Sequence, residues 1–168
     1  MVNTTKYTSE DIFNFLKEIE DPEIPVINIV ELGIVRDVKL YDDKIEISIT
    51  PTYSGCPAMK VIEDQVLSSL QEKGLKNIKI KTIYSPAWTT DWITHETKEK
   101  LRKYGITPPS KVSVEDVFPF LEQKKVDVQC PYCNSTETRV TSKFGSTPCK
   151  ALHFCNHCHQ PFEEFKCI

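Results

Sequence analysis

Two Cys-x-x-Cys pairs near the end of the chain constrain its fold more than any other feature. Cys130 and Cys133 form the first pair, Cys155 and Cys158 form the second, and 21 residues separate the pairs. This spacing is close to that of tetrahedral zinc sites, in which each pair supplies two thiolates from one tight turn. We therefore predict a zinc ribbon over residues 127–168. Its zinc is expected to be structural, because four protein thiolates close the coordination shell.

The segments around these cysteines agree with a small metal-stabilised module. Residues 138–144 and 162–166 have strand character. A module of about 40 residues lacks a sufficient core, so zinc binding would supply folding energy. Cys149, on the connection between the pairs, is either a core residue or a second exposed thiol. The roles of Cys149 and Cys167 stay open at this point.

Composition and charge restrict the compartment and the partners. The chain has 168 residues, a net charge of -3 and no long apolar run, so we expect no membrane span and no anionic membrane partner. Residues 127–168 hold four basic and four acidic side chains, so a nucleic-acid-binding ribbon is also disfavoured. No secretory signal is recognisable, which indicates a cytoplasmic protein. Seven cysteines in a reducing compartment favour metal binding or thiol chemistry over disulfides.

Residues 1–105 show the pattern of an α+β domain, a small sheet with helices packed on it. Thr8, with Asp11 three residues later, forms a capping box at the start of the first helix. The expected elements are a helix after Thr8, a hairpin of strands 34–41 and 44–50, a helix from Pro57 to Gly74, a strand over 78–83 and a helix over 94–104. Residues 106–126, rich in proline, are expected to form a linker with one short turn that docks through Phe118 and Leu121.

The stretch from Thr50 to Pro57, TPTYSGCP, runs from the end of a predicted strand into a predicted helix. It puts Cys56 at the expected N-cap and Pro57 at the first helical position, where its missing N–H costs nothing. Amides at a helix start stabilise a thiolate and lower the pKa of a cysteine. Cys56 is therefore a candidate nucleophile or metal ligand. The alternative is a small buried hydrophobic residue, packed under Trp88 or Trp92.

Several polar side chains could gather around Cys56. Gly55 would supply a backbone conformation that other residues resist, and hydroxyls and helix amides could then surround the sulfur. The extended segment that begins at Asp21 could bring carboxylates to the same end of the sheet. A thiol enzyme would need a base, and the candidates outside the ribbon are carboxylates and His95. The candidate supporting residues are Asp21, Glu23, Thr52, Ser54, Gly55, Thr89, Thr90 and Asp91.

Three stretches of the first domain carry a family resemblance: DPEIPVINIVELGIV, TPTYSGCPAM and SPAWTTDWI. They resemble the MIP18 family, which is linked to iron-sulfur cluster assembly, over about the first 105 residues. In that family the cysteine of a T-x-x-x-C-P motif, here Thr52 to Pro57, is associated with cluster or metal handling. The resemblance therefore implies that Cys56 handles iron or a cluster, bound transiently.

The ribbon narrows the resemblance further through CPYC, FGSTPCKAL and PFEEFKCI. With them the whole chain is similar to the family of D (or J) subunits of the bacterial phenylacetyl-CoA epoxidase (phenylacetate-CoA oxygenase) system. This implies an accessory role in aerobic phenylacetate degradation, with other epoxidase components or iron-sulfur client proteins as partners.

The chain lacks the motifs of the catalytic components in such a system. It has no Glu-x-x-His pair for a di-iron site, no Gly-rich dinucleotide fingerprint and no ferredoxin cysteine spacing. We therefore expect an assembly subunit that does not catalyse epoxidation. The alternatives are a structural or interaction subunit and a thiol-dependent enzyme that uses Cys56. A small antiparallel sheet could also leave an edge for pairing with a second copy of the chain.

Overall fold

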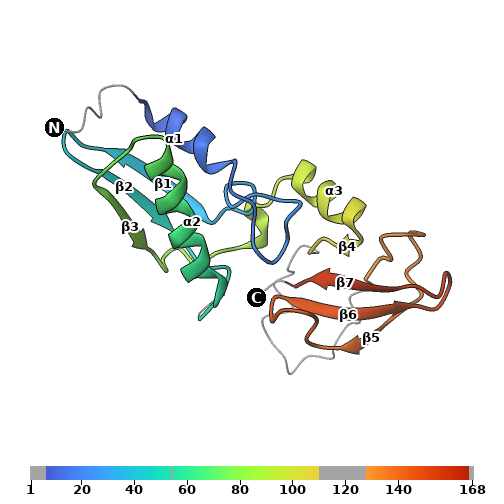
Figure 1. The fold of residues 1–168 in the computed structure, drawn as a ribbon. Coiled ribbons are helices and arrows are strands. Elements are labelled where there is room, and N and C mark those ends of the chain that lie inside the picture. The colour runs from blue at the N-terminus through green and yellow to red at the C-terminus, as the bar shows by residue number, and fades with distance from the viewer. Residues whose placement is uncertain (1–6, 54, 110–127, 167–168) are drawn as a thin grey trace. The chain divides into compact units, whose positions relative to one another are not determined.

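The computed structural model describes residues 7–53, 55–109 and 128–166. These residues form two compact units, which meet in the chain between Ile93 and Thr94 (Figure 1). The sequence places the domain boundary later, after residue 105. Within the described residues, no helix has both the length and the apolar character needed to cross a membrane.

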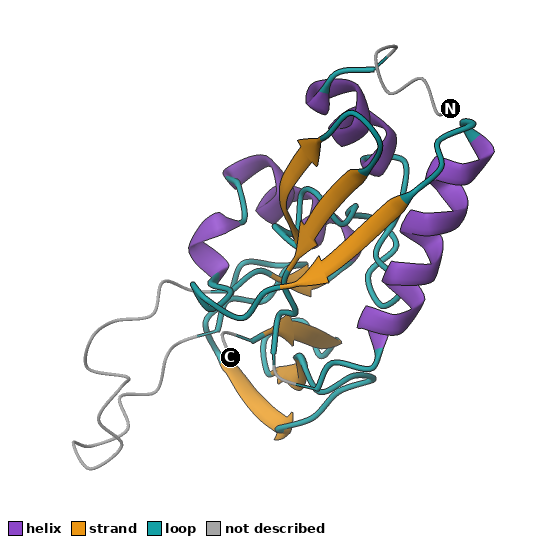
Figure 2. Ribbon diagram, turned by 90° about the vertical axis from the view of Figure 1, so that its left-hand side faces the viewer, coloured by secondary structure: helices purple, strands orange, loops and turns teal. Residues whose placement is uncertain are grey.

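The first unit is an α+β fold around a three-stranded sheet (Figures 1 and 2). Its elements are α1 (Ser9–Leu16), β1 (Val35–Leu40), β2 (Ile45–Ile49), α2 (Ala58–Glu72), β3 (Ile78–Thr82) and the short 3-10 helix η2 (Thr90–Trp92). The strand order is β1-β2-β3. The predicted hairpin is present as the antiparallel pair β1 and β2.

The pairing of β3 corrects the expectation of an antiparallel sheet. β3 pairs with β2 in parallel, with Ile45 opposite Ile78 and Ile49 opposite Thr82. The reason is the connection: α2 carries the chain back along the sheet, so the next strand starts at the same end as β2. The carboxyl ends of β2 and β3 therefore lie at one edge of the sheet, where the loop to Cys56 begins.

The core of the first unit follows from side-chain periodicity. Alternate residues of β2 are fully buried, and each helix buries one face. The buried side chains of these elements are Ile12, Leu16, Ile45, Ile47, Ile49, Ile62, Val66 and Leu70. The predicted capping box is confirmed, because the Thr8 hydroxyl accepts from the Asp11 N–H and the Asp11 carboxylate accepts from the Thr8 N–H.

The second unit contains α3 and a four-stranded sheet. Its elements are α3 (His95–Tyr104), β4 (Ile106–Thr107), β5 (Thr138–Ser142), β6 (Lys150–Cys155) and β7 (Pro161–Phe165), and the strand order is β4-β7-β6-β5. β6 pairs antiparallel with both of its neighbours, while β4 pairs with β7 in parallel. The predicted helix after Thr94 is confirmed, with Thr94 as its N-cap and Gly105 at its end in a left-handed conformation.

Two strands of this unit differ from the sequence-based expectation. β6 was not predicted, because its inward positions include a histidine, His153, which hides the apolar alternation. Residues 106 and 107 were assigned to the linker but form β4, since a two-residue strand leaves no periodic pattern. The rest of that segment, with the docking turn at Phe118 and Leu121, lies outside the described residues.

Candidate metal centre and thiol site

The two Cys-x-x-Cys turns have the same backbone hydrogen bonds. The N–H of Cys130 donates to the Ser135 carbonyl at 2.9 Å, and the N–H of Asn134 donates to the Cys130 carbonyl at 3.0 Å. In the second turn Cys155 donates to Gln160, and His159 donates to Cys155, both at 3.0 Å. Each turn therefore presents its two sulfur atoms in the same way.

Both turns also share one unusual backbone conformation. Asn134 and His159, each four residues after the first cysteine of its pair, have φ angles of 62° and 58°. Asparagine adopts this left-handed region readily, whereas histidine does so less often. The repeated geometry indicates that closing the turn requires a left-handed residue at this position.

The four sulfur atoms of the predicted zinc ligands lie together, all within 4.8 Å of one another. The Sγ atoms of Cys130 and Cys158 are 3.7 Å apart, and those of Cys133 and Cys155 are 3.6 Å apart. A tetrahedral zinc with Zn–S bonds of about 2.3 Å places its sulfur atoms roughly 3.8 Å apart. The arrangement thus fits a structural metal ion bound by four thiolates.

The local structure favours ionisation of one cysteine of the quartet. The N–H of Cys158 points at the Cys155 sulfur at 3.5 Å and lowers the pKa of Cys155 to about 6, with a smaller contribution from the N–H of His157. Burial raises the pKa of Cys158 to about 12. Metal binding requires deprotonated cysteines, so it would release a proton from each cysteine of the quartet that is still protonated in the metal-free chain.

The thiol of Cys56 lies one residue before the helix cap. α2 begins at Ala58 with Pro57 as its N-cap, so the prediction that Cys56 is the N-cap is wrong. Cys56 belongs instead to a preceding turn, in which its N–H donates to the Tyr53 carbonyl at 3.3 Å. The side chain is half-buried and free of any disulfide.

The acidity of Cys56 also differs from the prediction. Burial raises the pKa of the thiol, and the nearby Glu23 carboxylate raises it further. The N–H groups of Ala58 and Met59 at the helix start lower it, as does the Tyr53 side chain, but these contributions are smaller. The helix start therefore stabilises the thiolate as expected, yet desolvation has the larger effect.

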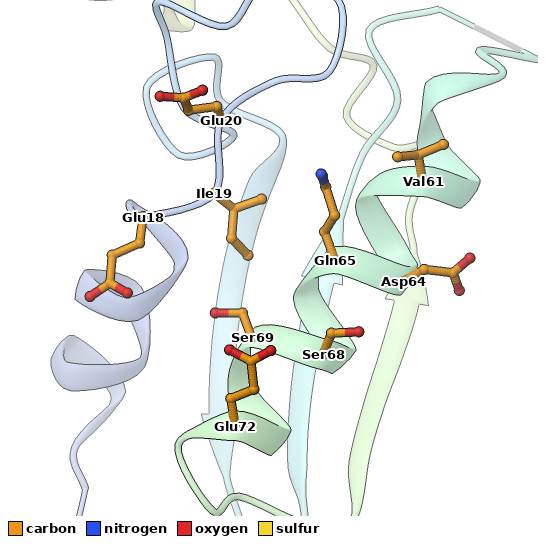
Figure 3. A pocket seen from close by; sticks show the side chains of 9 residues that line it. All are labelled: Glu18, Ile19, Glu20, Val61, Asp64, Gln65, Ser68, Ser69 and Glu72. Atoms are coloured by element: carbon orange, nitrogen blue, oxygen red, sulfur yellow. The ribbon is translucent and has the colours of Figure 1, made fainter.

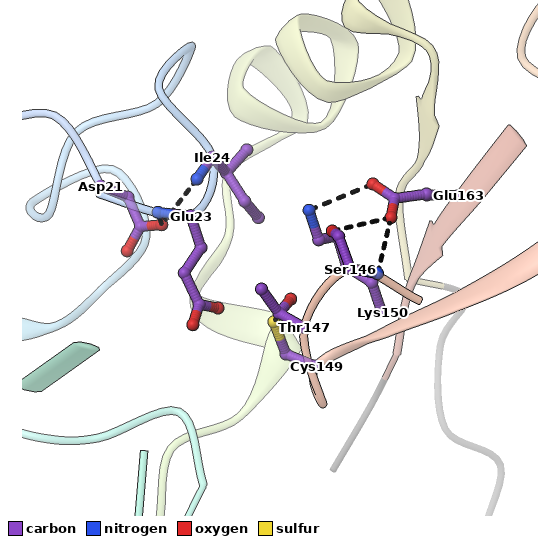
Figure 4. A network of polar contacts seen from close by, with 8 residues as sticks. All are labelled: Asp21, Glu23, Ile24, Ser146, Thr147, Cys149, Lys150 and Glu163. Carbon is purple, nitrogen blue, oxygen red and sulfur yellow. Dashed lines mark hydrogen bonds and ion pairs between the residues drawn. The ribbon is translucent and has the colours of Figure 1, made fainter. Parts of the chain in front are cut away.

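Asp21 shapes the segment that carries Glu23. The Asp21 side chain is only 4% exposed, and its Oδ1 accepts from the N–H groups of Glu23 and Ile24, both at 2.9 Å (Figure 4). The two predicted carboxylates, Asp21 and Glu23, therefore have different roles. Asp21 holds the turn, whereas Glu23 acts electrostatically on Cys56.

The loop before Cys56 contains one confirmed conformational prediction. Gly55 has a φ of +82°, a left-handed conformation that side chains disfavour. Thr52 is half-buried in the same loop, and Ser54 lies outside the described residues. Tyr53, which was not among the predicted site residues, contributes to the environment of the thiol. Its place inside the T-x-x-x-C-P motif was the available signal.

The loop 85–93 is organised mainly by contacts of its own. The Thr89 side chain accepts from the Asp91 N–H and caps η2, and Thr90 is buried. Trp88 donates from Nε1 to the Leu32 carbonyl at 2.9 Å. The Arg36 guanidinium stacks on the Trp92 ring, with Arg36 Cζ 3.4 Å from the centre of that ring. The proposed role of Thr89, Thr90 and Asp91 beside Cys56 stays a prediction.

A polar network in the second unit was not recognised in the sequence. The Glu163 carboxylate accepts from the N–H and hydroxyl of Ser146, at 3.1 Å and 2.8 Å, and its other oxygen lies 3.1 Å from Lys150 Nζ (Figure 4). The Cys149 sulfur is buried and lies 3.0 Å from the Thr147 hydroxyl. The network braces the loop before β6, and Cys149 is a buried residue rather than an exposed thiol.

Two family models match separate parts of the chain. Residues 9–81 match the family described as iron-sulfur cluster assembly protein. Residues 115–166 match the PaaD zinc beta ribbon domain. The chain therefore joins a domain of the iron-sulfur cluster assembly class to a zinc ribbon, as the MIP18 and ribbon motifs implied.

A relative that spans both modules identifies the family of the whole chain more specifically. This relative, from Escherichia coli strain K12, is named as the D subunit of a "Putative 1,2-phenylacetyl-CoA epoxidase". The two sequences are 42% identical over 158 residues, a match that covers 94% of the chain and 92% of the relative. The chain belongs to the family of these epoxidase D subunits.

The first module has relatives and structural neighbours of its own. The chain is 35% identical over 103 residues to an "Fe-S protein maturation auxiliary factor" of Porphyromonas gingivalis, which covers 60% of the chain and 97% of that protein. A domain of unknown function, DUF59, from Bacillus anthracis is 26% identical with a TM-score of 0.52, covering 55% of this chain and 90% of that one. A conserved hypothetical protein from Thermotoga maritima is 28% identical with a TM-score of 0.50, covering 57% and 95%.

Proposed function

We propose that this chain is an accessory component of the phenylacetyl-CoA epoxidase system that assists iron or iron-sulfur cluster maturation of the other components. The carrying observation is the 42% identity to an epoxidase D subunit across both modules. The similarity of the first module to Fe-S protein maturation auxiliary factors supports the maturation role.

The ribbon and the first unit have different tasks in this proposal. Cys130, Cys133, Cys155 and Cys158 hold a structural zinc, whose four thiolates leave no position open for catalysis. Cys56 receives an iron ion or a cluster as cargo. Cys56 is only half-buried, which suits a residue that must pass its cargo to a client.

The raised pKa of Cys56 suits a cargo ligand better than a nucleophile. At neutral pH the thiol keeps its proton, so its intrinsic reactivity is low. An arriving cation displaces that proton, and the Glu23 carboxylate, which disfavours the free thiolate, then stabilises the added positive charge. A thiol enzyme would need the opposite shift, so this alternative is disfavoured.

The test is to express the other epoxidase components alone, with the wild-type chain, and with Cys56→Ser, and to measure iron in each purified component. We expect low iron without the chain and with Cys56→Ser, and full iron with the wild type. Cys149→Ser is the matched control, because it removes a cysteine outside both sites. Equal iron in all preparations would instead indicate a purely structural component.

A further inference from the structure

A groove between the end of α1 and the outer face of α2 has no part in the proposed function. Its volume is about 610 Å³. Figure 3 shows Glu20 at one end, Glu72 at the other and Gln65 and Ser69 between them. The lining residues are Glu18, Ile19, Glu20, Val61, Asp64, Gln65, Ser68, Ser69 and Glu72.

The groove is negatively charged. Four of its lining side chains are carboxylates and none is basic. Lys73 Nζ lies 2.7 Å from Glu18, and Lys60 Nζ lies 2.9 Å from Asp64, so neighbouring lysines neutralise two of the four. Among the described residues, Glu20 and Glu72 take part in no ion pair. Two unneutralised charges therefore remain, one at each end of the groove.

Between and beside these charges the groove is lined by small and apolar side chains. Ser68 and Ser69 contribute short side chains, which allow another backbone to approach α2 closely. Val61, near the Glu20 end, is 47% exposed, and Ile19 lies across the groove from α2. From Val61 to Glu72 the groove follows α2 for about 16 Å, roughly three helical turns. Its length and shape fit a helix packed alongside α2.

We propose that this groove docks a basic amphipathic helix of a partner protein. Arginines at the two ends of the helix would pair with Glu20 and Glu72, and an apolar side chain on the same face would cover Val61, which lies near the Glu20 end. Arginine suits these ends because its methylene groups can pack on apolar surface while the guanidinium binds a carboxylate in a fork. The proposal does not depend on the chemistry of Cys56.

The test measures binding of a fluorescein-labelled helical peptide of about 15 residues, roughly four turns, by fluorescence anisotropy. The peptide carries arginines at both ends of one face and leucines between them. In a matched peptide, glutamates replace the arginines. We expect the wild-type chain to bind the arginine peptide and not the glutamate peptide.

Variants separate the groove from general electrostatic attraction. Glu20→Gln with Glu72→Gln should weaken binding about 10-fold or more, the effect of about 1.4 kcal/mol, and Val61→Ser should weaken it measurably. Glu10→Gln with Glu137→Gln removes the same charge from exposed positions outside the groove and should leave binding unchanged. Equal weakening by the control pair, or no effect of Val61→Ser, would overturn the proposal.

Discussion

Short-range and longer-range interactions shift the pKa of the Cys56 thiol in opposite directions. The amides of Ala58 and Met59 act over hydrogen-bond distance and favour the thiolate, while burial and the Glu23 carboxylate favour the neutral thiol. Because burial and the Glu23 carboxylate together have the larger effect, the pKa of the thiol lies above its ordinary value. A folded-state pKa that is raised in this way reduces the thiolate fraction at neutral pH.

We expect Cys56 to react with iodoacetamide more slowly than free cysteine at pH 7. Its labelling rate should rise with pH, with a midpoint above that of an unperturbed thiol, because alkylation proceeds through the thiolate. Glu23→Gln should lower the midpoint and speed labelling, since it removes a nearby negative charge. Quantitative mass spectrometry of the Cys56 peptide measures both rates. Faster labelling than free cysteine in the wild type would show that the helix amides dominate after all.

The helix start at Thr8 offers a second residue-level test. Thr8→Ala removes the acceptor for the Asp11 N–H and should destabilise the first unit by about 1 kcal/mol. Thr8→Ser keeps a capping hydroxyl and should restore most of the loss. Urea unfolding followed by far-UV circular dichroism measures the difference. An unchanged unfolding midpoint in Thr8→Ala would mean that α1 is held by its buried face alone.

At the scale of elements, the loop before β6 is held by an ion pair that is largely shielded from water. Lys150 is 5% exposed, and the Glu163 carboxylate beside it also accepts from Ser146. Burial alone would raise the pKa of Glu163, but the hydrogen bonds from Ser146 and the Lys150 ammonium outweigh it and lower that pKa. β6 and β7 are thus joined by the Lys150–Glu163 ion pair as well as by their backbone hydrogen bonds.

Glu163→Gln should weaken this connection by about 3 kcal/mol, because it removes the carboxylate charge beside the buried Lys150 ammonium. The expected result is faster amide hydrogen exchange in β6 and β7 of the zinc-loaded chain. Glu137→Gln, at an exposed position of the same unit, is the matched control and should leave exchange unchanged. Exchange rates that are equal in Glu163→Gln and wild type would show that the ion pair contributes nothing to the loop.

At the scale of the whole molecule, the two units depend on different sources of stability. The first unit buries isoleucines from its sheet together with one face of each helix. The buried cluster around the four cysteines is small, with Val128 and Phe162 as its other members. A core of this size needs a metal ion to hold the ribbon together.

Zinc removal should therefore unfold the ribbon and leave the first unit folded. Elemental analysis of the purified chain is expected to find one zinc per chain, absent in Cys130→Ser and retained in Cys149→Ser. After chelation, hydrogen exchange should accelerate in β5, β6 and β7 and stay unchanged in β2 and α2. Bound iron in place of zinc, or faster hydrogen exchange in β2 after chelation, would contradict the prediction that zinc stabilises the ribbon alone.

Much of the fold and of the metal site could be predicted from the sequence because the signals are local. The capping box at Thr8, the hairpin of β1 and β2 and the positive φ of Gly55 each depend on a few neighbouring residues. The same holds for the two Cys-x-x-Cys turns, whose sulfur atoms the structure brings together. Periodicity and spacing are properties of the chain itself, so they can be recognised before it folds.

Tertiary structure alone decided the features that depend on distant residues. The parallel pairing of β4 with β7 joins segments more than 50 residues apart, which no local pattern relates. The pKa of Cys56 was predicted with the wrong sign, because the sequence reveals the helix start but not the burial of the sulfur or the approach of Glu23. Desolvation and long-range charge arise only when the chain has closed around a site, and at Cys56 they outweigh the local amides.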